Sequence, residues 1–267
     1  IQELFFIFWH LQKTLSSSLA NILAKPNKNL RLVINDLAIN FLGVSDVIND
    51  KVNANVKVGW VHTDYDQLTV NKQMDRNIYS KLDFIVNVSE DCNRVFLKHY
   101  PELFPKAIVV ENILSKKMIV MQSNAFCPNS EMPKKKGFTT ILSIGRYGRA
   151  KNFENIPEIV SKILARGVNV IWYIIGYGSE ECNIKKKVIE FNMQENVILL
   201  GRKENPYPFI KACDIYAQPS RYEGKSVTVR EAQILCKPVV ITNYETAPSQ
   251  IKDKFNGSIV PMDNIVV

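Results

Sequence analysis

The chain has 267 residues, of which 46% are hydrophobic and 22% are charged, and its formal net charge is +8. This length and apolar content allow two domains with buried cores and exclude an intrinsically disordered chain. The excess of basic residues favours anionic partners, namely nucleotide phosphates, a membrane surface or nucleic acid, and lysines on solvated faces are the alternative.

The first half of the chain predicts an α/β domain over residues 1–118 whose opening unit is missing. Helices are expected at residues 4–23, 70–81 and 90–100, and strands at residues 30–34, 56–60, 84–88 and 107–111. The sequence begins at Ile1 with the helical pattern, without a strand and a glycine-rich turn before it. Both ends look cut, so we expect the chain to be a fragment of a longer protein.

A polar, lysine-rich segment with Pro128 and Pro133 follows, and it predicts a linker over residues 119–137. Residues 138–267 then alternate regularly between strand and helix patterns. Strands are expected at residues 140–144, 168–175, 196–200, 214–218, 238–242 and 257–260, helices at residues 153–166, 179–192, 206–213 and 226–236, and a short helical turn at residues 247–251. The strands are nearly continuous apolar runs, which predicts a doubly wound parallel α/β domain with both sheet faces covered.

Five cysteines are scattered along the chain without the spacing of a zinc site or a disulfide framework, which favours a reducing compartment. The longest apolar run near the start, residues 4–9, is too short to span a bilayer. Its aromatic residues Phe5, Phe6, Phe8 and Trp9 favour a packed helix face, and contact with a membrane surface is the alternative.

Two carboxylates with seven residues between them, Glu223 and Glu231, flank a turn, Gly224-Lys225-Ser226, that predicts the start of a helix. The free N–H groups and the positive dipole end of a helix start suit a phosphate. A carboxylate on each side of that phosphate suits the hydroxyl groups of a sugar nucleotide. The alternatives are an exposed loop carboxylate for Glu223 and, for Glu231, a capping box that begins at Thr228.

Ligands of doubly wound sheets bind beyond the carboxyl ends of the strands. Several glycine and basic positions are expected at that edge: Gly145-Arg146, Gly176, Gly201-Arg202 and residues 220–223. Arg146 could chelate phosphate oxygens as a planar fork and Lys151 could act as a point charge, with a solvated basic loop as the alternative.

These motifs resemble the GT-B retaining glycosyltransferases, specifically glycosyltransferase family 4 and, within it, bacterial surface-polysaccharide enzymes. The resemblance rests on Glu223 with Glu231, on Gly145-Arg146 with Lys151, on Leu200-Gly201-Arg202 and on Trp60-Val61-His62, and it covers about residues 56–260. It implies an α/β fold of GT-B architecture, in which two doubly wound Rossmann-like domains face a cleft. The first, acceptor-side domain is incomplete, and the family's final helix, which crosses back onto that domain, is absent from the sequence.

The resemblance also implies a reaction and its residues. A hexosyl unit would move, with retention, from a nucleotide-diphosphate sugar (a UDP or GDP sugar) to a growing surface glycan of capsule, lipopolysaccharide or teichoic type. The implied roles are catalytic for His62 and Glu223, diphosphate binding for Arg146, Lys151, Gly224, Lys225, Ser226 and Val227, and nucleoside binding for Arg202 and Glu231. No metal and no further cofactor is expected. The partners would be the nucleotide sugar and a glycan or glycolipid acceptor, for a cytoplasmic protein in peripheral contact with the inner membrane.

Three of these motifs have other interpretations. His62 alone favours a buried or hydrogen-bonded histidine. Gly176-Tyr177-Gly178 favours a tight strand-to-helix turn over a dinucleotide site, because the full glycine pattern is missing. Asp64-Tyr65-Asp66 matches the D-x-D metal motif of the GT-A fold, but its place in a polar loop favours a chance match.

Other functions are weighed against transfer. A sugar-nucleotide epimerase would need a cluster of carboxylates and histidines that the sequence does not show. A non-catalytic or truncated nucleotide-sugar-binding module is the alternative that the cut ends favour. Nucleic-acid binding is disfavoured, since the basic residues are not interleaved with aromatic residues in a recognisable module.

Overall fold

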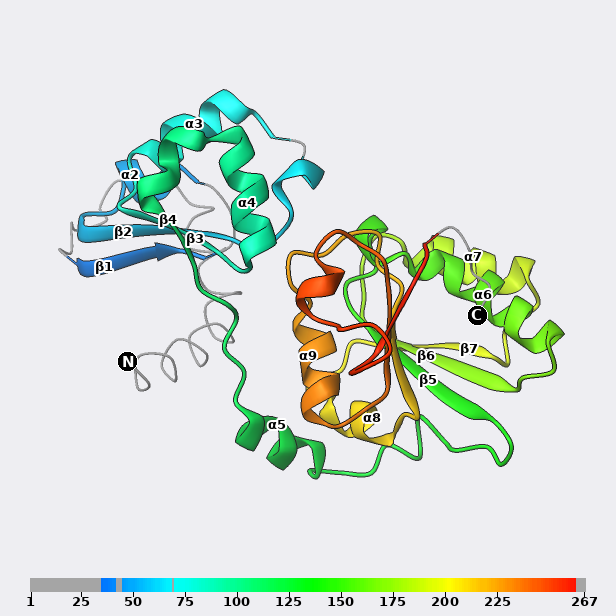
Figure 1. Cartoon of the computed structure of the whole chain (residues 1–267). Coiled ribbons are helices and arrows are strands. Elements are labelled where there is room, and N and C mark those ends of the chain that lie inside the picture. Colours follow the sequence, from blue (N-terminus) through cyan, green and yellow to red (C-terminus); the bar gives the residue numbers. More distant parts are fainter. Residues whose placement is uncertain (1–34, 42–44, 69, 263–267) are drawn as a thin grey trace.

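The structure, a computed structural model, describes residues 35–41, 45–68 and 70–262. Within these residues the chain forms two parallel β-sheets, one in each half, with helices packed against them (Figure 1). The predicted α/β fold class is therefore confirmed. The helix expected at residues 4–23 and the strand expected at residues 30–34 lie outside the described residues.

The first sheet contains four parallel strands in the order β1-β2-β3-β4, so it advances in one direction only. Its strands are β1 (Asn35–Asn40), β2 (Ala54–Val61), β3 (Phe84–Asn87) and β4 (Ala107–Val109), and its helices are α2 (Val47–Asp50), α3 (Lys72–Ser80) and α4 (Glu90–His99). Helices α3 and α4 lie on the same side of the sheet (Figure 1). An aromatic cluster that includes Tyr65, Tyr79 and Phe96 fills the space beneath them.

The predicted strands and helices from β2 to β4 are confirmed to within a few residues, whereas β1 and α2 were not predicted. Strand β1 has the sequence Asn-Asp-Leu-Ala-Ile-Asn and lies at an edge of the described sheet, where it pairs only with β2. An edge strand can carry polar residues, so it lacks the continuous apolar run that marks a strand buried on both faces.

The second sheet has six parallel strands in the order β10-β9-β8-β5-β6-β7. They are β5 (Thr139–Ile144), β6 (Val170–Ile175), β7 (Val197–Gly201), β8 (Ile215–Gln218), β9 (Val239–Thr242) and β10 (Ser258–Val260), and the helices are α6 (Ile156–Ala165), α7 (Glu181–Glu190), α8 (Tyr207–Ala212) and α9 (Val227–Ile234). All of these elements were predicted, with shifts of at most a few residues at their ends.

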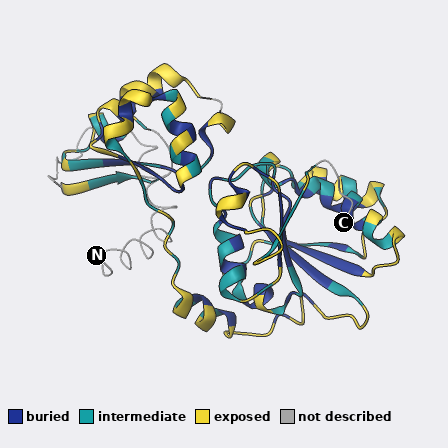
Figure 2. Cartoon of the chain, viewed as in Figure 1, coloured by how far each residue is buried: buried dark blue, intermediate teal, exposed yellow. Residues whose placement is uncertain are grey.

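Both faces of this sheet are covered because side chains alternate along each strand. In β6, Ile171 and Tyr173 belong to the core beneath α8 and α9, whereas Trp172 and Ile174 belong to the core beneath α6 and α7. All six residues of β6 are buried, as the dark strands at the centre of the domain show (Figure 2). This is the doubly wound arrangement that the apolar runs predict.

The strand order reverses at β5, which pairs with β6 on one side and with β8 on the other. The chain runs outward from β5 to β7, and from β8 to β10 it runs outward in the opposite direction. The loops after β5 and β8 therefore meet at the carboxyl edge of the sheet, where such a switch point leaves room for a ligand.

Helix α5 (Lys116–Ser123) crosses the predicted boundary at residues 118 and 119 and was not predicted. Its first turn is capped by Ser115, whose Oγ accepts a hydrogen bond from the Met118 N–H at 3.3 Å. The helix packs against α8 and α9 (Figure 1), and Asn205 Nδ2 donates to the Gln122 carbonyl at 2.9 Å. The lysine-rich composition of this segment concealed a helix that is anchored to the second domain.

Short 3₁₀ helices complete the described structure: η1 (Tyr65–Gln67), η2 (Pro101–Lys106), η3 (Arg149–Lys151), η4 (Phe153–Asn155) and η5 (Ala247–Ser249). The last of these lies in the predicted helical turn at residues 247–251. No helix in the described part of the chain is long and apolar enough to cross a membrane.

The turn after β6 requires glycine. Gly176 has a φ of +154°, and a Cβ added there would lie 1.9 Å from the Gly145 carbonyl oxygen. The loops after β5 and β6 can approach each other this closely only without a side chain at position 176. Gly176-Tyr177-Gly178 is therefore a tight strand-to-helix turn, as predicted.

We expect Gly176→Ala to lower the free energy of unfolding by about 2 kcal/mol or more, because alanine is strained at this φ and clashes with backbone. Urea unfolding followed by circular dichroism measures the change. Gly148→Ala is the matched control, since Gly148 is extended (φ −149°) and a Cβ there would meet nothing within 4 Å. Equal unfolding midpoints for the two variants would contradict the argument.

Candidate functional site

Two predicted site residues meet at the switch point of the second sheet. Lys151, from the loop after β5, places its Nζ 2.6 Å from Oε1 of Glu223, from the loop after β8. The same oxygen accepts hydrogen bonds from Ser220 Oγ at 2.6 Å and from Gln218 Nε2 at 3.3 Å. The side chains of Lys151 and Glu223 are only 19% and 12% exposed, so this ion pair is shielded far better than a surface pair.

Backbone contacts hold the two loops together around this pair. The Arg221 N–H donates to the Ala150 carbonyl at 2.7 Å, and the Arg221 guanidinium bonds both the Arg149 carbonyl and Glu154. The aliphatic part of Lys151 lies along Gly145, where an added Cβ would come 2.9 Å from Lys151 Cε. The loops after β5 and β8 thus form one wall of the site.

The predicted helix start after Glu223 is confirmed. Helix α9 begins at Val227, and Ser226 is its extended N-cap residue. The alternative with Thr228 as the N-cap is wrong, because Thr228 lies inside the helix. The Ser226 N–H donates to Gln250 Oε1 at 3.0 Å, and Gln250 Nε2 donates back to the Ser226 carbonyl at 2.8 Å. These two hydrogen bonds occupy the Ser226 N–H and fix the backbone where the chain enters α9.

Glu231 lies on the buried side of α9 and is only 7% exposed. Tyr207, at the start of α8, donates its hydroxyl to Glu231 Oε1 at 2.9 Å. Burial raises the pKa of Glu231 from 4.5 to about 7, and the Tyr207 hydrogen bond opposes part of that rise. The carboxyl group is therefore poised between its neutral and charged forms near neutral pH.

His62 follows the end of β2 and lies between aromatic rings. Its ring centroid is 4.4 Å from that of Phe41, in an edge-to-face arrangement, and 6.2 Å from that of Trp60. His62 bonds the Phe41 backbone, whereas its Nε2 is buried and has no hydrogen-bond partner among the described residues. Burial lowers the pKa of His62, which favours the neutral form of the ring.

The two domains touch at the turn before α9. A Cβ added to Gly224 would lie 2.2 Å from the His62 carbonyl oxygen, so the glycine backbone is pressed against the end of β2. Lys225 pairs with Glu111, and Arg230 Nη1 donates to the Asn112 carbonyl at 2.8 Å. The turn and the histidine, which the sequence placed in different domains, are thereby neighbours.

Two predicted residues are not brought into this cluster. Arg146 is exposed, and neither a hydrogen bond nor an ion pair links its side chain to another described residue. Arg202, after β7, places its guanidinium carbon 5.5 Å from the ring centroid of Tyr177. Their proposed contacts with diphosphate and base stay predictions.

The D-x-D sequence has a local structural role. Asp64 Oδ1 accepts a hydrogen bond from the Asp66 N–H at 3.0 Å, which caps η1, and Asp66 pairs with His99. No group of three or more potential metal ligands occurs in the part of the chain that the structure describes.

Other residues of the site were not predicted. They are Gln218, Tyr207 and Gln250, together with Ser89 of the first domain, whereas Ser220 lies within residues 220–223, which were expected at this edge of the sheet. Gln218 could have been found from its place at the end of β8. The others act through contacts that join distant segments and leave no local signal.

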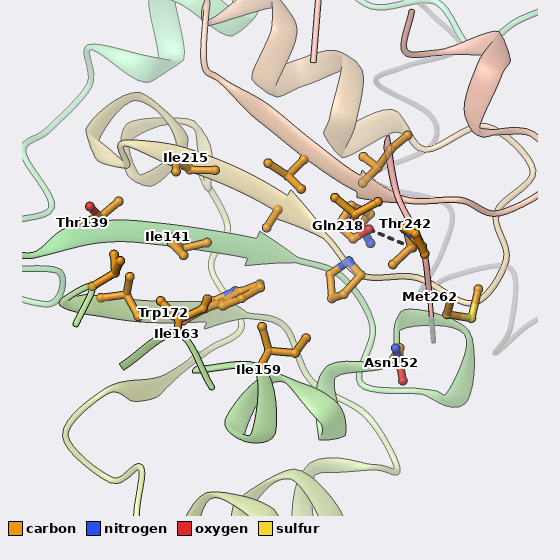
Figure 3. Close-up of a pocket in the computed structure, with 18 of the residues that line it drawn as sticks. Thr139, Ile141, Asn152, Ile159, Ile163, Trp172, Ile215, Gln218, Thr242 and Met262 are labelled. Atoms are coloured by element: carbon orange, nitrogen blue, oxygen red, sulfur yellow. Dashed lines mark hydrogen bonds between the residues drawn. The ribbon is translucent and has the colours of Figure 1, made fainter. Parts of the chain in front are cut away.

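A separate hollow of about 290 Å³ lies over the second sheet (Figure 3). Ile141, Trp172 and Ile215 of the sheet face Ile159 and Ile163 of α6 across it. Of the site residues only Gln218 lines it, none of the predicted ones does, and its wall is almost entirely apolar. It therefore does not suit a phosphate or a sugar.

Solved structures with the same fold show the architecture of the chain. The chain aligns with a Staphylococcus aureus TarM structure that contains UDP, with a TM-score of 0.63 and 21% identity over 80% of this chain and 43% of that one. It aligns with pneumococcal O-GlcNAc transferase GtfA in complex with UDP and GlcNAc, with a TM-score of 0.66 and 17% identity over 88% of this chain and 47% of that one. The architecture is therefore that of the GT-B glycosyltransferases.

The model of the family described as "Glycosyl transferases group 1" matches residues 129–265, which are 137 of the chain's 267 residues. The chain belongs to this family. One relative is the Campylobacter jejuni N-acetylgalactosamine-N,N'-diacetylbacillosaminyl-diphospho-undecaprenol 4-alpha-N-acetylgalactosaminyltransferase, 26% identical over 73% of this chain and 51% of that protein.

Another relative is the Staphylococcus aureus poly(ribitol-phosphate) alpha-N-acetylglucosaminyltransferase, 28% identical over 49% of this chain and 27% of that protein. The matched regions span between 27% and 51% of the length of these curated relatives.

The raised pKa of Glu231 predicts a pH-dependent stability difference. The folded state binds this proton more tightly than the unfolded state, so the contribution of Glu231 to stability is full below pH 4.5 and is lost as the pH rises to about 7. We expect Glu231→Gln, which keeps the acceptor for Tyr207, to gain about 1–3 kcal/mol relative to wild type between pH 4.5 and pH 8.

Urea unfolding of both proteins at several pH values measures this difference. Tyr207→Phe, which removes the hydroxyl that opposes the rise in pKa, is the companion variant. A stability difference between wild type and Glu231→Gln that does not change with pH would contradict the assignment.

Proposed function

We propose that the chain carries the donor site of a retaining glycosyltransferase, which moves a hexosyl unit from a nucleotide-diphosphate sugar to a growing surface glycan. The observation that carries the proposal is the meeting of Lys151 with Glu223 beside the start of α9, at the switch point of the second sheet. Membership of the glycosyl transferases group 1 family supports it independently.

The donor diphosphate is assigned to Lys151, Arg146 and the turn before α9. Cleavage of a glycosyl–phosphate bond leaves negative charge on the diphosphate, and groups already held in place stabilise this charge best. The N–H groups of Gly224 and Lys225 donate to no described residue, so they are available to phosphate oxygens. This proposal assigns charge compensation to side chains and N–H groups rather than to a metal ion.

A diphosphate must exchange with an existing partner in this site. Lys151 is already paired with Glu223. A bound phosphate would replace Glu223 as the partner of Lys151, whose ammonium group the ion pair already holds in place. Glu223 keeps its bonds from Ser220 and Gln218 to Oε1 during such an exchange. Its second oxygen, Oε2, bonds no described residue and is assigned to a hydroxyl of the donor sugar.

The nucleoside and the reacting sugar are assigned to opposite sides of the diphosphate. Glu231, held by Tyr207, would accept hydrogen bonds from the ribose, and Arg202 would lie beside the base. His62, which lies at the end of β2 beside Gly224, would face the reacting sugar from the other domain. Retention without a protein nucleophile would fit a front-face displacement.

The acceptor is proposed from the relatives. Their names specify a poly(ribitol-phosphate) and a diphospho-undecaprenol glycolipid as acceptors. A glycan or glycolipid of capsule, lipopolysaccharide or teichoic type is therefore the proposed acceptor. We place the reaction in the cytoplasm, in peripheral contact with the membrane face, where the net charge of +8 favours anionic lipids. UDP is the proposed nucleotide, because both named structural neighbours contain it.

Lys151→Met should weaken UDP binding about 10–100-fold, because it removes a charge-assisted bond and leaves Glu223 facing the diphosphate. Arg146→Ala should also weaken binding if it contacts the same group. Isothermal titration calorimetry with UDP and GDP measures both effects. Lys162→Met, on the surface of α6 in a pair with Glu158, is the matched control and should bind like wild type. Unchanged affinity in Lys151→Met would refute the phosphate assignment.

Glu223→Gln should lower kcat at least about tenfold, because a bond to the reacting sugar matters most when charge develops on it. Its affinity for UDP should stay within about threefold of wild type, since the amide still accepts from Ser220. Release or transfer of sugar from a radiolabelled nucleotide sugar measures kcat, and Glu158→Gln is the surface control. Tight UDP binding by wild type without sugar release or transfer would favour a non-catalytic nucleotide-sugar-binding module instead.

A further inference from the structure

The turn before α9 is held in part by its own domain. Thr246 Oγ1 donates to the Glu223 carbonyl at 2.9 Å, and Gln250 bonds both the N–H and the carbonyl of Ser226. These two side chains fix the peptide groups at each end of the turn. The peptide group between them, which joins Gly224 to Lys225, is held by neither.

The Gly224 carbonyl is held from the first domain instead. It accepts hydrogen bonds from Ser89 Oγ at 3.3 Å and from Cys92 Sγ at 3.5 Å, across 135 and 132 residues of sequence. Ser89 is 1% exposed and Cys92 is fully buried, so water does not replace these donors. Burial raises the pKa of the Cys92 thiol to about 11, which keeps its proton in place.

Ser89 serves two elements with one hydroxyl group. It is the N-cap of α4, where Oγ accepts a hydrogen bond from the Cys92 N–H at 3.1 Å. Its hydrogen is donated to the Gly224 carbonyl. A hydroxyl has one hydrogen to give, so the cap of α4 orients the hydroxyl toward the turn of the other domain.

The planarity of the peptide group passes this contact on to the donor site. In a trans peptide the N–H points opposite to the carbonyl, so a fixed Gly224 carbonyl fixes the direction of the Lys225 N–H. That N–H donates to no described residue, and it faces away from α4. Contact of Gly224 with the His62 carbonyl holds the same peptide from the side.

We propose that Ser89 is a positioning residue of the first domain, which aims the Lys225 N–H of the second domain at an oxygen of the donor diphosphate. This inference rests on the proposed function, because Ser89 would hold part of the proposed donor site in position. One hydrogen-bond donor of the site, the Lys225 N–H, would then depend on contact between the two domains.

Ser89→Ala, Ser89→Thr and Ser115→Ala test this role. Ser115 caps α5 by the same kind of bond, to the Met118 N–H, so Ser115→Ala reports the loss of a helix cap without loss of the grip on the turn. Amide hydrogen exchange by NMR, with saturating UDP, reads the Lys225 N–H directly. Urea unfolding reports the stability of each variant.

With UDP bound, we expect Ser89→Ala to lower protection of the Lys225 amide about tenfold and to leave the amides within α9 unchanged. Its kcat with a UDP-sugar should fall about tenfold while UDP affinity changes at most about threefold, because charge on the diphosphate grows during the reaction. Ser89→Thr, which keeps the hydroxyl, should restore both, and Ser115→Ala should match wild type.

The inference is overturned if wild type binds UDP and Lys225 is protected equally in Ser89→Ala. It is also overturned if protection is lost only within α4, since that would mark Ser89 as a structural cap. Failure of wild type to bind UDP would instead refute the proposed function itself.

Discussion

The ion pair between Lys151 and Glu223 is the contact on which the second domain's site depends. It forms because β5 pairs with both β6 and β8, so that the loops after β5 and β8 leave the sheet side by side. Each charge alone would be costly in a place so poorly exposed, and together they satisfy each other. Ser220 and Gln218 add neutral donors to the same carboxylate oxygen, which leaves the pair little freedom to rearrange.

The second constraint is the absence of a side chain at Gly224. The carbonyl of His62 occupies the space that a Cβ would need, so the first domain approaches the backbone of the turn itself. Lys225, the next residue, extends this contact to Glu111 of the first domain. The histidine of one domain and the helix start of the other therefore share a wall made of main chain rather than of adjustable side chains.

Much of this arrangement could be predicted from the sequence because it follows from local patterns. The apolar runs predicted every strand of the second sheet, and Gly224 to Ser226 predicted the start of α9. What could not be predicted depends on distant partners. Polar residues in β1, at the edge of the described sheet, concealed that strand, and lysines in α5 gave that helix the composition of a linker.

The hydrogen-bond partners of the site residues could not be predicted from local patterns either. Tyr207 reaches Glu231 from another helix, and Ser89 reaches Gly224 from another domain. The spacing of these residues in the sequence predicts neither contact. The exposed position of Arg146 is equally a matter of loop geometry, which glycine and arginine at a strand end do not determine.

Charge also shapes how the two halves of the molecule are joined. Around the buried contact at Gly224, ion pairs across the junction join Glu111 to Lys225 and Arg230, and Arg94 to Glu245. Glu111, Arg94 and Glu245 are about half exposed, so dissolved salt weakens these ion pairs. The screening length is roughly 10 Å at 0.1 M salt. Ionic strength therefore acts on the contacts that hold the two halves of the molecule together.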